Sequence, residues 1–356
     1  MIDGIEAVAP PAASESRYRQ RQARRAAIVV GLALAVCLSL ALDVATGPSG
    51  IGPARLWQVL AQPDSVPRTE VVIVWNVRLP YALMAVLVGA ALACAGAEMQ
   101  TVLANPLASP FTLGISAAAS FGAALAIVLD WGIPGVPAQY LASVNAFVFA
   151  LLSVALLYLL VRWRGLGVES LVLFGIALVF SFNALVALLQ FVASQDSLQQ
   201  LVFWSLGSLA RSSWGKLAVL AVVLALLLPA SLRQSWAMTA LTLGEERARG
   251  FGVDVERLRW FSLLRISLLA GLSVSFVGVV GFIGLVAPHI ARMLVGDDHR
   301  LMLPASALAG ALVLSLASVA GKNLIDGVLI PVGIVTALVG IPFFMAIVLR
   351  TREARR

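Results

Sequence analysis

The stretch LTLGEERARGFGVDVERLR, residues Leu241–Arg259, interrupts a chain that is otherwise almost continuously apolar. Four arginines and four acids surround Gly250 and Gly252, so the stretch predicts two short helices joined by a turn. Because a stretch this polar does not enter lipid, it must lie in water. Two short helices at a membrane surface can fit the groove of a partner protein; the alternative is a solvated loop without a partner.

The composition predicts the fold class. Of the 356 residues, 60% are hydrophobic and 12% are charged, and the mean hydropathy is +0.96. A soluble domain could not cover so much apolar surface, so the sequence predicts an all-α polytopic membrane protein. The net charge of +7 does not indicate a nucleic-acid partner, because most basic residues lie at the ends of apolar runs. Cys37 and Cys94 lie inside apolar runs and predict neither a disulfide nor a metal cluster.

Ten apolar runs are long enough to cross the hydrocarbon of a bilayer, which is about 30 Å thick. The boundary between the seventh and eighth runs is the weakest, because Gly278, Gly281 and Gly284 allow a tight reversal inside apolar sequence. Nine or eleven spans therefore stay open. The predicted spans lie near residues 26–46, 79–99, 112–130, 139–161, 170–193, 214–232, 260–279, 281–295, 302–321 and 332–350.

The distribution of basic residues predicts the orientation. With ten spans both termini lie on one side, and the segments on that side hold eighteen Lys and Arg residues against six on the other. Because positive residues mark the cytoplasmic side, both termini of this multi-pass membrane protein are expected in the cytoplasm. The predicted organisation is a cytoplasmic tail at 1–25, a transmembrane domain at 26–350 with a cytoplasmic loop at 239–259, and a cytoplasmic tail at 351–356.

Two further patterns concern packing and the outer surface. Residues 47–77 form the one longer outer connection, with a short amphipathic piece around residues 54–61. Small residues crowd Gly89–Ala97 and Gly310–Ala320. Such residues let helix backbones approach closely in lipid, so tight bundle packing is expected.

The sequence contains no motif typical of catalysis, and no catalytic residue is predicted. It lacks the G-x-x-x-x-G-K-[ST] run that cradles phosphates, so the chain is not expected to hydrolyse ATP. His289 and His299 have no second ligand at metal-binding spacing. Ionisable residues fall near the predicted span ends, which disfavours a proton-coupled carrier, although sodium sites made of carbonyls and hydroxyls stay open. These residues are Asp43, Glu98, Asp130, Arg265, Lys322 and Asp326.

Several long motifs follow one another along the chain. They are RLPYALMAVLVGAALACAGAEMQTVLANPLASPFTLGIS (Arg78–Ser116), LFGIAL (Leu173–Leu178), FWSLGSL (Phe203–Leu209), LGEERARGFG (Leu243–Gly252), GFIGLVAPHIARMLVGDDHRLMLPASALAGA (Gly281–Ala311) and PVGIVTALVGIPFF (Pro331–Phe344). Together they resemble the FecCD-type permease subunits of binding-protein-dependent ABC importers for iron–siderophores, haem and vitamin B12. The resemblance implies a type II importer-like permease with ten spans, paired with a second permease subunit around a central path. It also implies a pair of cytoplasmic ATPase subunits, which bind ATP and Mg²⁺, and a periplasmic binding protein; no cofactor is expected on this chain.

The resemblance also implies roles for individual residues. LGEERARGFG is similar to the family's coupling helices, so the predicted ATPase contact consists of Gly244, Glu245, Arg247, Ala248, Arg249 and Gly252. Arg78 and Lys322 align with basic positions that meet acids of the binding protein, and Arg55, Arg68 or Arg211 are expected to share that task. Interfacial anchoring is the alternative for these residues.

The same resemblance assigns the path and its gate. The fifth span and its neighbours are expected to line the path, with Asn183, Gln190, Gln195 and Trp204 as candidates and ordinary packing as the alternative. The turn Gly165–Ser170 aligns with the inner gate, where Val168 and Glu169 replace the small hydroxyl residues of the vitamin B12 permease. The favoured hypothesis is that the protein imports a ferric siderophore or a similar iron chelate. Haem and vitamin B12 are alternative cargoes; a self-powered secondary carrier or a membrane enzyme are the alternative classes.

Overall fold

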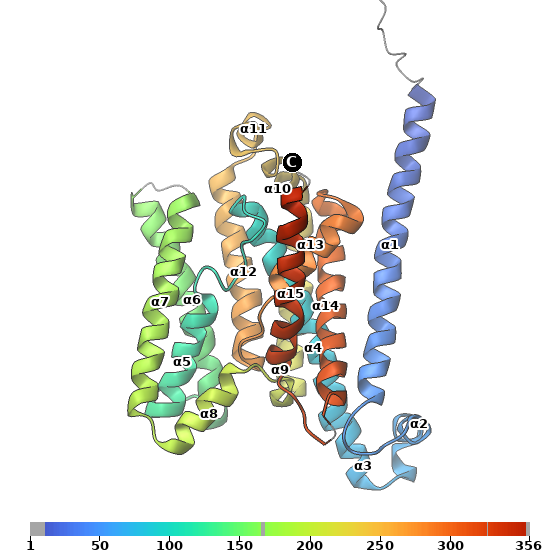
Figure 1. Cartoon of the computed structure of the whole chain (residues 1–356), viewed down its shortest axis with the longest axis vertical. Coiled ribbons are helices and arrows are strands. Elements are labelled where there is room, and N and C mark those ends of the chain that lie inside the picture. Colours follow the sequence, from blue (N-terminus) through green and yellow to red (C-terminus); the bar gives the residue numbers. More distant parts are fainter. Residues whose placement is uncertain (1–10, 165–167, 326, 354–356) are drawn as a thin grey trace, which may run out of the picture.

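The computed structural model describes residues 11–164, 168–325 and 327–353, and every regular element in these ranges is a helix (Figure 1). Within these ranges, seven helices are long and apolar enough to cross a membrane, and three shorter apolar helices accompany them. These ten match the ten predicted runs one for one, which confirms the predicted fold class. In chain order they are α1 (Pro11–Ala45), α4 (Leu79–Val102), α5 (Ile115–Leu129), α6 (Ala138–Arg164), α7 (Val168–Val192), α9 (Trp214–Arg233), α12 (Val255–Val277), α13 (Ile283–Val295), α14 (His299–Asn323) and α15 (Val332–Glu353). Asp326 lies outside the described residues.

Two of the ten helices are too short to cross the hydrocarbon alone. α5 has 15 residues and α13 has 13, so at 1.5 Å per residue they reach only about 20–23 Å. Non-helical chain supplies the remaining depth: residues 103–114 lead from α4 into α5, and residues 278–282 reverse the chain between α12 and α13. Gly278 has a φ of +82° in this reversal. The predicted glycine turn between the seventh and eighth spans is therefore confirmed.

α4 is the central helix of the bundle and packs against α9, α12, α13 and α14. Its small residues allow close contact, since a Cβ atom added at Gly89 would clash with the carbonyl oxygen of Gly310 on α14. A Cβ atom at Gly96 would clash in the same way with the carbonyl of Gly284 on α13. The predicted tight packing of small-residue segments is confirmed, and it makes α4 the fixed core around which the other helices are placed.

α7 contrasts with α4 and lies at the edge of the bundle, at the left of Figure 1. Only 11% of its most apolar window is buried. Leu173, Phe180 and Phe191 expose 68%, 71% and 88% of their surfaces. In this chain alone, α7 therefore presents an apolar face that only lipid or another subunit can cover.

The shorter elements gather at the two ends of the bundle (Figure 1). One end, which we call the α11 end, carries α10 (Ser235–Leu241) and α11 (Glu245–Gly250), together with the start of α1 and the end of α15. The other, the α8 end, carries α2 (Pro53–Ala61), α3 (Arg68–Val72) and α8 (Gln195–Ser205). α2 confirms the predicted amphipathic piece, because Leu56 and Val59 are buried while Trp57 is 71% exposed.

Candidate functional site

The charged stretch Leu241–Arg259 lies at the α11 end. The sequence predicts short helices on both sides of Gly250 and Gly252, and the first of them is α11. The second is not a separate helix but the opening turn of α12, because the carboxylate of Asp254 accepts the backbone N–H of Arg257 at 3.0 Å and caps that long helix. The charged stretch is thus continuous with a helix that enters the bundle core.

A small hydrophobic cluster holds α11 in place. Ala248 is fully buried and packs in a cluster with Met238 and Leu241 of α10, with Val253 in the following turn and with Leu258 at the start of α12. A larger side chain would find no room at the contact. Ala248 therefore positions the loop from beneath, which agrees with a shaping role but not with direct contact to a partner.

Glu245 ties α11 to both neighbouring segments. One carboxylate oxygen accepts a hydrogen bond from Arg249 at 2.8 Å and the other accepts one from Arg259 at 3.1 Å. Burial raises the pKa of Glu245, but the hydrogen bond from Arg249 and the charge and hydrogen bond of Arg259 outweigh it and lower the pKa below its ordinary value of 4.5. The stabilisation is therefore present at neutral pH and is lost as the pH falls through the lowered value.

The loop also exposes large apolar side chains that the sequence reasoning missed. Leu243 and Phe251 are 53% and 57% exposed on either side of α11, and the charged Arg247 and Arg249 are exposed between them. Exposed apolar residues in a polar, water-facing loop are typical of a contact surface. The sequence could have indicated this surface, because Leu243 and Phe251 stand next to glycines within a charged stretch.

Two glycines give the loop its shape. Gly244 has a φ of +106° and Gly252 has a φ of +83°, a backbone region that other residues rarely adopt. A Cβ atom at either position would meet no atom within 4 Å, so the requirement is conformational and not steric. Gly250 is equally open and has no such φ, which makes it a matched comparison.

A buried ion pair lies below the loop, where α12 crosses α4. Arg265 of α12 donates from Nε to both carboxylate oxygens of Glu98 at 2.9 and 3.0 Å, and its Nη2 lies 2.9 Å from Glu98 Oε2. The hydroxyl of Ser231 on α9 donates to the same carboxylate, and Arg265 also donates to Ser262 at 3.0 Å. Both charged side chains are almost fully buried. The pair joins three bundle helices and neutralises its own charges.

Lys322 does not lie on the surface. Its Nζ donates to the Asp43 carboxylate at 2.6 Å and to the Asp43 carbonyl at 2.8 Å, and it lies 4.6 Å from the ring centre of Tyr81. Ser318 donates to both oxygens of the same carboxylate. Lys322 is therefore buried between α1 and α14, and the prediction that it offers a charge to a binding protein is wrong for this reason.

Arg78 is buried as well, with 5% exposure. It donates to Ser49 Oγ at 2.7 Å and to backbone carbonyls of Val44, Ala45 and Ile51 at 3.2–3.4 Å. Its guanidinium binds the end of α1 to the connection that follows it and does not face the surface. The docking prediction for Arg78 is therefore also wrong. The sequence did not reveal this contact, because the carbonyls come from the end of α1 and from the irregular connection after it.

The other predicted docking residues stay nearer the surface. Arg55 is half exposed and bonds Glu70 at 2.7 Å and Gln58 at 2.9 Å. Arg68 is exposed at the start of α3, and within the described part of the chain no side chain pairs with it. Arg211 lies in η3 (Leu209–Arg211) and takes part in a pocket.

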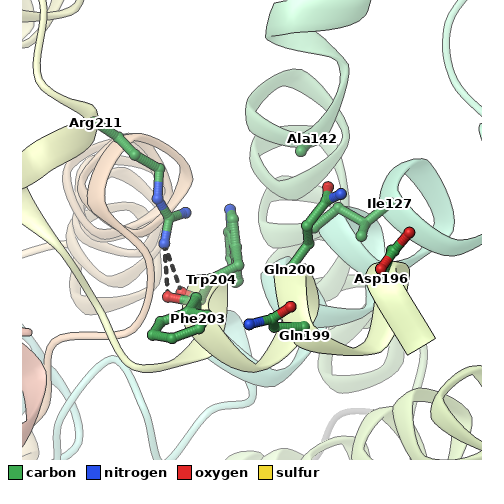
Figure 2. A pocket seen from close by; sticks show the side chains of 8 residues that line it. All are labelled: Ile127, Ala142, Asp196, Gln199, Gln200, Phe203, Trp204 and Arg211. Carbon is green, nitrogen blue, oxygen red and sulfur yellow. Dashed lines mark hydrogen bonds between the residues drawn. The ribbon is translucent and has the colours of Figure 1, made fainter.

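That pocket, at the α8 end, has a volume of about 560 Å³. Trp204 and Arg211 lie side by side at one end of it and Asp196 at the other (Figure 2). The structure thus brings two predicted residues together, although Trp204 was predicted for the path and Arg211 for docking. The lining residues are Ile127, Ala142, Asp196, Gln199, Gln200, Phe203, Trp204 and Arg211.

The remaining path candidates are separate from the pocket. Asn183 is exposed on α7 and, within the described residues, has no hydrogen-bond partner, while Gln190 is half-buried on the same helix. Gln195 is exposed at the start of α8. Of the predicted gate Gly165–Ser170, residues 165–167 lie outside the described part; Val168 and Glu169 begin α7, but their side chains are not described.

The comparisons with known proteins agree with this architecture. The sequence model of the FecCD transport family matches residues 26–350. The chain belongs to this family. The hemin transport system permease protein HmuU of Yersinia pestis is 40% identical to this FecCD chain over 79% of the chain and 85% of the relative. The vitamin B12 import system permease protein BtuC of Vibrio cholerae is 35% identical over 94% and 97%.

A solved structure gives the same result. A protein described as an inward-facing ABC transporter of the metal-chelate type superposes with a TM-score of 0.78 at 32% identity, covering 91% of the FecCD chain and 99% of that chain. The chain is therefore a multi-pass membrane protein and a permease subunit of an ABC importer. Among the described residues, no group of three or more His, Cys, Asp or Glu side chains could hold a metal ion.

Proposed function

We propose that this permease translocates an iron(III)–siderophore or similar iron chelate across the bacterial inner membrane, driven by ATP hydrolysis on a partner subunit. Membership of the FecCD family supports the proposal most directly, and the neighbour described as a metal-chelate type transporter agrees with a metal-chelate cargo, a class that also includes haem and vitamin B12. The buried ion pairs Glu98–Arg265 and Asp43–Lys322 leave no free carboxylate for a proton-driven carrier among the bundle residues described above.

The α11 end is assigned to the cytoplasm, so both termini lie there. The Arg-rich start of α1 and the charged loop lie together at that end, as basic residues do on cytoplasmic surfaces. α11, with exposed Leu243 and Phe251 beside Arg247 and Arg249, would dock in the ATPase subunit that binds ATP and Mg²⁺. Closure of the ATPase dimer would then displace α11 together with α12.

The α8 end is assigned to the periplasm, where a binding protein delivers the cargo. With Arg78 and Lys322 buried, the exposed Arg68 becomes the main docking candidate, and Arg55, which is half exposed and paired with Glu70, is the second. Exposed charges of this kind act mainly on the rate of encounter. The apolar face of α7 is assigned to a second permease subunit, either a copy of this chain or a related one, with the path between the two.

Asn183 provides a test of this path. The exposed amide without a partner on an apolar helix is costly toward lipid, which favours a position on the path. Asn183→Trp is therefore expected to block uptake while leaving assembly with the ATPase intact. Leu185→Trp is the matched control, because Leu185 is also exposed, at 40%, but points to the opposite side of α7. Normal uptake per assembled complex in Asn183→Trp would remove Asn183 from the path.

The cargo proposal is tested with the intact system reconstituted in vesicles. ATP-dependent uptake of radiolabelled ferric chelates is compared with uptake of haem and of vitamin B12, each presented by the cognate binding protein. Saturable uptake of a ferric chelate alone supports the proposal. Uptake restricted to haem or vitamin B12 would contradict the cargo assignment, and uptake without ATP would contradict the class.

A further inference from the structure

The pocket at the α8 end contains a guanidinium that is held in place before any ligand arrives. Arg211 Nη2 donates to the carbonyls of Phe203 and Trp204 at 2.9 and 3.2 Å, at the end of α8, and its Cζ lies 5.7 Å from the Trp204 ring centre (Figure 2). Lys216 donates to the Arg211 carbonyl at 3.0 Å and adds a second positive charge nearby. A fixed guanidinium loses little side-chain freedom when it binds an anion.

Hydrogen-bond donors at this end of the pocket exceed the acceptors available to them. Arg211 Nη1 is buried and has no hydrogen-bond partner in the described part of the chain. The indole N–H of Trp204 also has no acceptor in that part, but its nitrogen is not fully buried. A buried donor without an acceptor is costly, and an incoming anionic oxygen would satisfy Arg211 Nη1 and would lie within reach of the indole N–H.

The other polar side chains that line the pocket would orient a bound anion. Gln199 and Gln200 add amide groups from α8, and Asp196 lies at the opposite end of the pocket from Arg211 (Figure 2). The carboxylate repels an anion from that end and directs it toward Arg211 and Trp204. A volume of about 560 Å³ is in the range of small-molecule sites.

From this arrangement we infer that the Arg211–Trp204 end of the pocket binds an anionic oxygen group, a carboxylate or catecholate, of the ferric chelate as it enters the path. The inference rests on the proposed function for the identity of the cargo. The same chemistry could come from an acidic side chain of the binding protein, and the test separates the two sources. The site would favour anionic chelates over neutral ones.

The test measures retention of radiolabelled chelates by the assembled permease–ATPase complex in nanodiscs, without ATP and without binding protein. The probes are an anionic ferric tris-catecholate and a neutral ferric tris-hydroxamate. Arg211→Gln is expected to lower retention of the anionic probe about tenfold or more, since a charge-assisted hydrogen bond is lost, and Trp204→Phe to lower it less. Asp196→Asn should retain the anionic probe at least as well as the native chain.

Controls and contrary outcomes follow from the same measurements. Arg300→Gln removes an equal charge from an exposed position at the start of α14, far from the pocket, and should change neither probe. Equal loss of both probes in Arg211→Gln, or no loss of either, would overturn the inference. Unchanged anionic retention with weaker association of cargo-free binding protein would assign the pocket to that protein instead. Because retention needs no transport, a failed uptake experiment and a failed pocket experiment are distinguishable.

Discussion

Arg265→Met is expected to destabilise the folded permease by roughly 3–5 kcal/mol, because it leaves the carboxylate of Glu98 buried without its cation. Glu98 is 1% exposed and Arg265 is 6% exposed, so water cannot replace the lost contacts. Among the described residues, only the hydroxyl of Ser231 would still donate to the carboxylate. The bundle surroundings make an unpaired charge especially costly, since lipid offers no compensating solvent.

A native cysteine can report the thermal unfolding of the Arg265→Met variant. Cys94 is a buried free cysteine on α4, one helical turn before Glu98, and Cys37 is an exposed one. In a Cys37→Ser background, a thiol-reactive dye reports thermal unfolding through the exposure of Cys94 alone. The midpoint for Arg265→Met is expected well below that of the background chain.

The double variant Glu98→Leu with Arg265→Met is the matched control. Removing both charges and replacing them with apolar side chains of similar size is often neutral or stabilising for a buried pair. Ser231 keeps a partner in that variant, because its hydroxyl can turn to the carbonyl of Leu227, 3.0 Å away. The double variant should therefore unfold above Arg265→Met. An equally low midpoint would show that packing around the site, not the unpaired charge, dominates.

The helices of this fold were predictable because lipid requires long apolar runs, whereas the partners of the buried charges were not. Asp43 and Lys322 are 279 positions apart and Glu98 and Arg265 are 167 apart. A single sequence places each of them near a span end, but it does not show which span lies beside which. Burial of Lys322 and Arg78 therefore appeared only once α1, α4 and α14 were placed together.

The charged loop, unlike the buried ion pairs, was predictable from local sequence. Its polarity, its glycines and its position before an apolar run are local features, so the α11 helix and its exposure followed from the sequence. The prediction of a second, separate short helix was wrong because the cap at Asp254 starts α12 directly. The pocket was also missed, since it combines α8 with the ends of α5 and α6 and with Arg211.

Gly252→Val is expected to reduce coupled transport about tenfold or more while leaving the membrane level of the permease unchanged. A β-branched residue at a φ of +83° costs about 1–2 kcal/mol or more, so the turn between α11 and α12 would leave its native conformation. Because no atom lies within 4 Å of the added Cβ, the effect comes from the backbone and not from a clash in the bundle. The exposed Phe251 would move with the turn, which would disturb the contact that we propose it makes with the ATPase subunit.

Gly250→Ala is the control for this substitution. Gly250 is equally open but lies in the helical turn of α11 with no positive φ, and alanine favours a helix over glycine by up to about 1 kcal/mol. It should transport normally. Glu245→Ala breaks the hydrogen bonds to Arg249 and Arg259. Its transport activity should lie between those of Gly252→Val and Gly250→Ala. Pull-down of the ATPase subunit, together with uptake by the purified complex, checks all three variants. If Gly252→Val binds the ATPase and transports as Gly250→Ala does, the shape of this turn does not govern coupling.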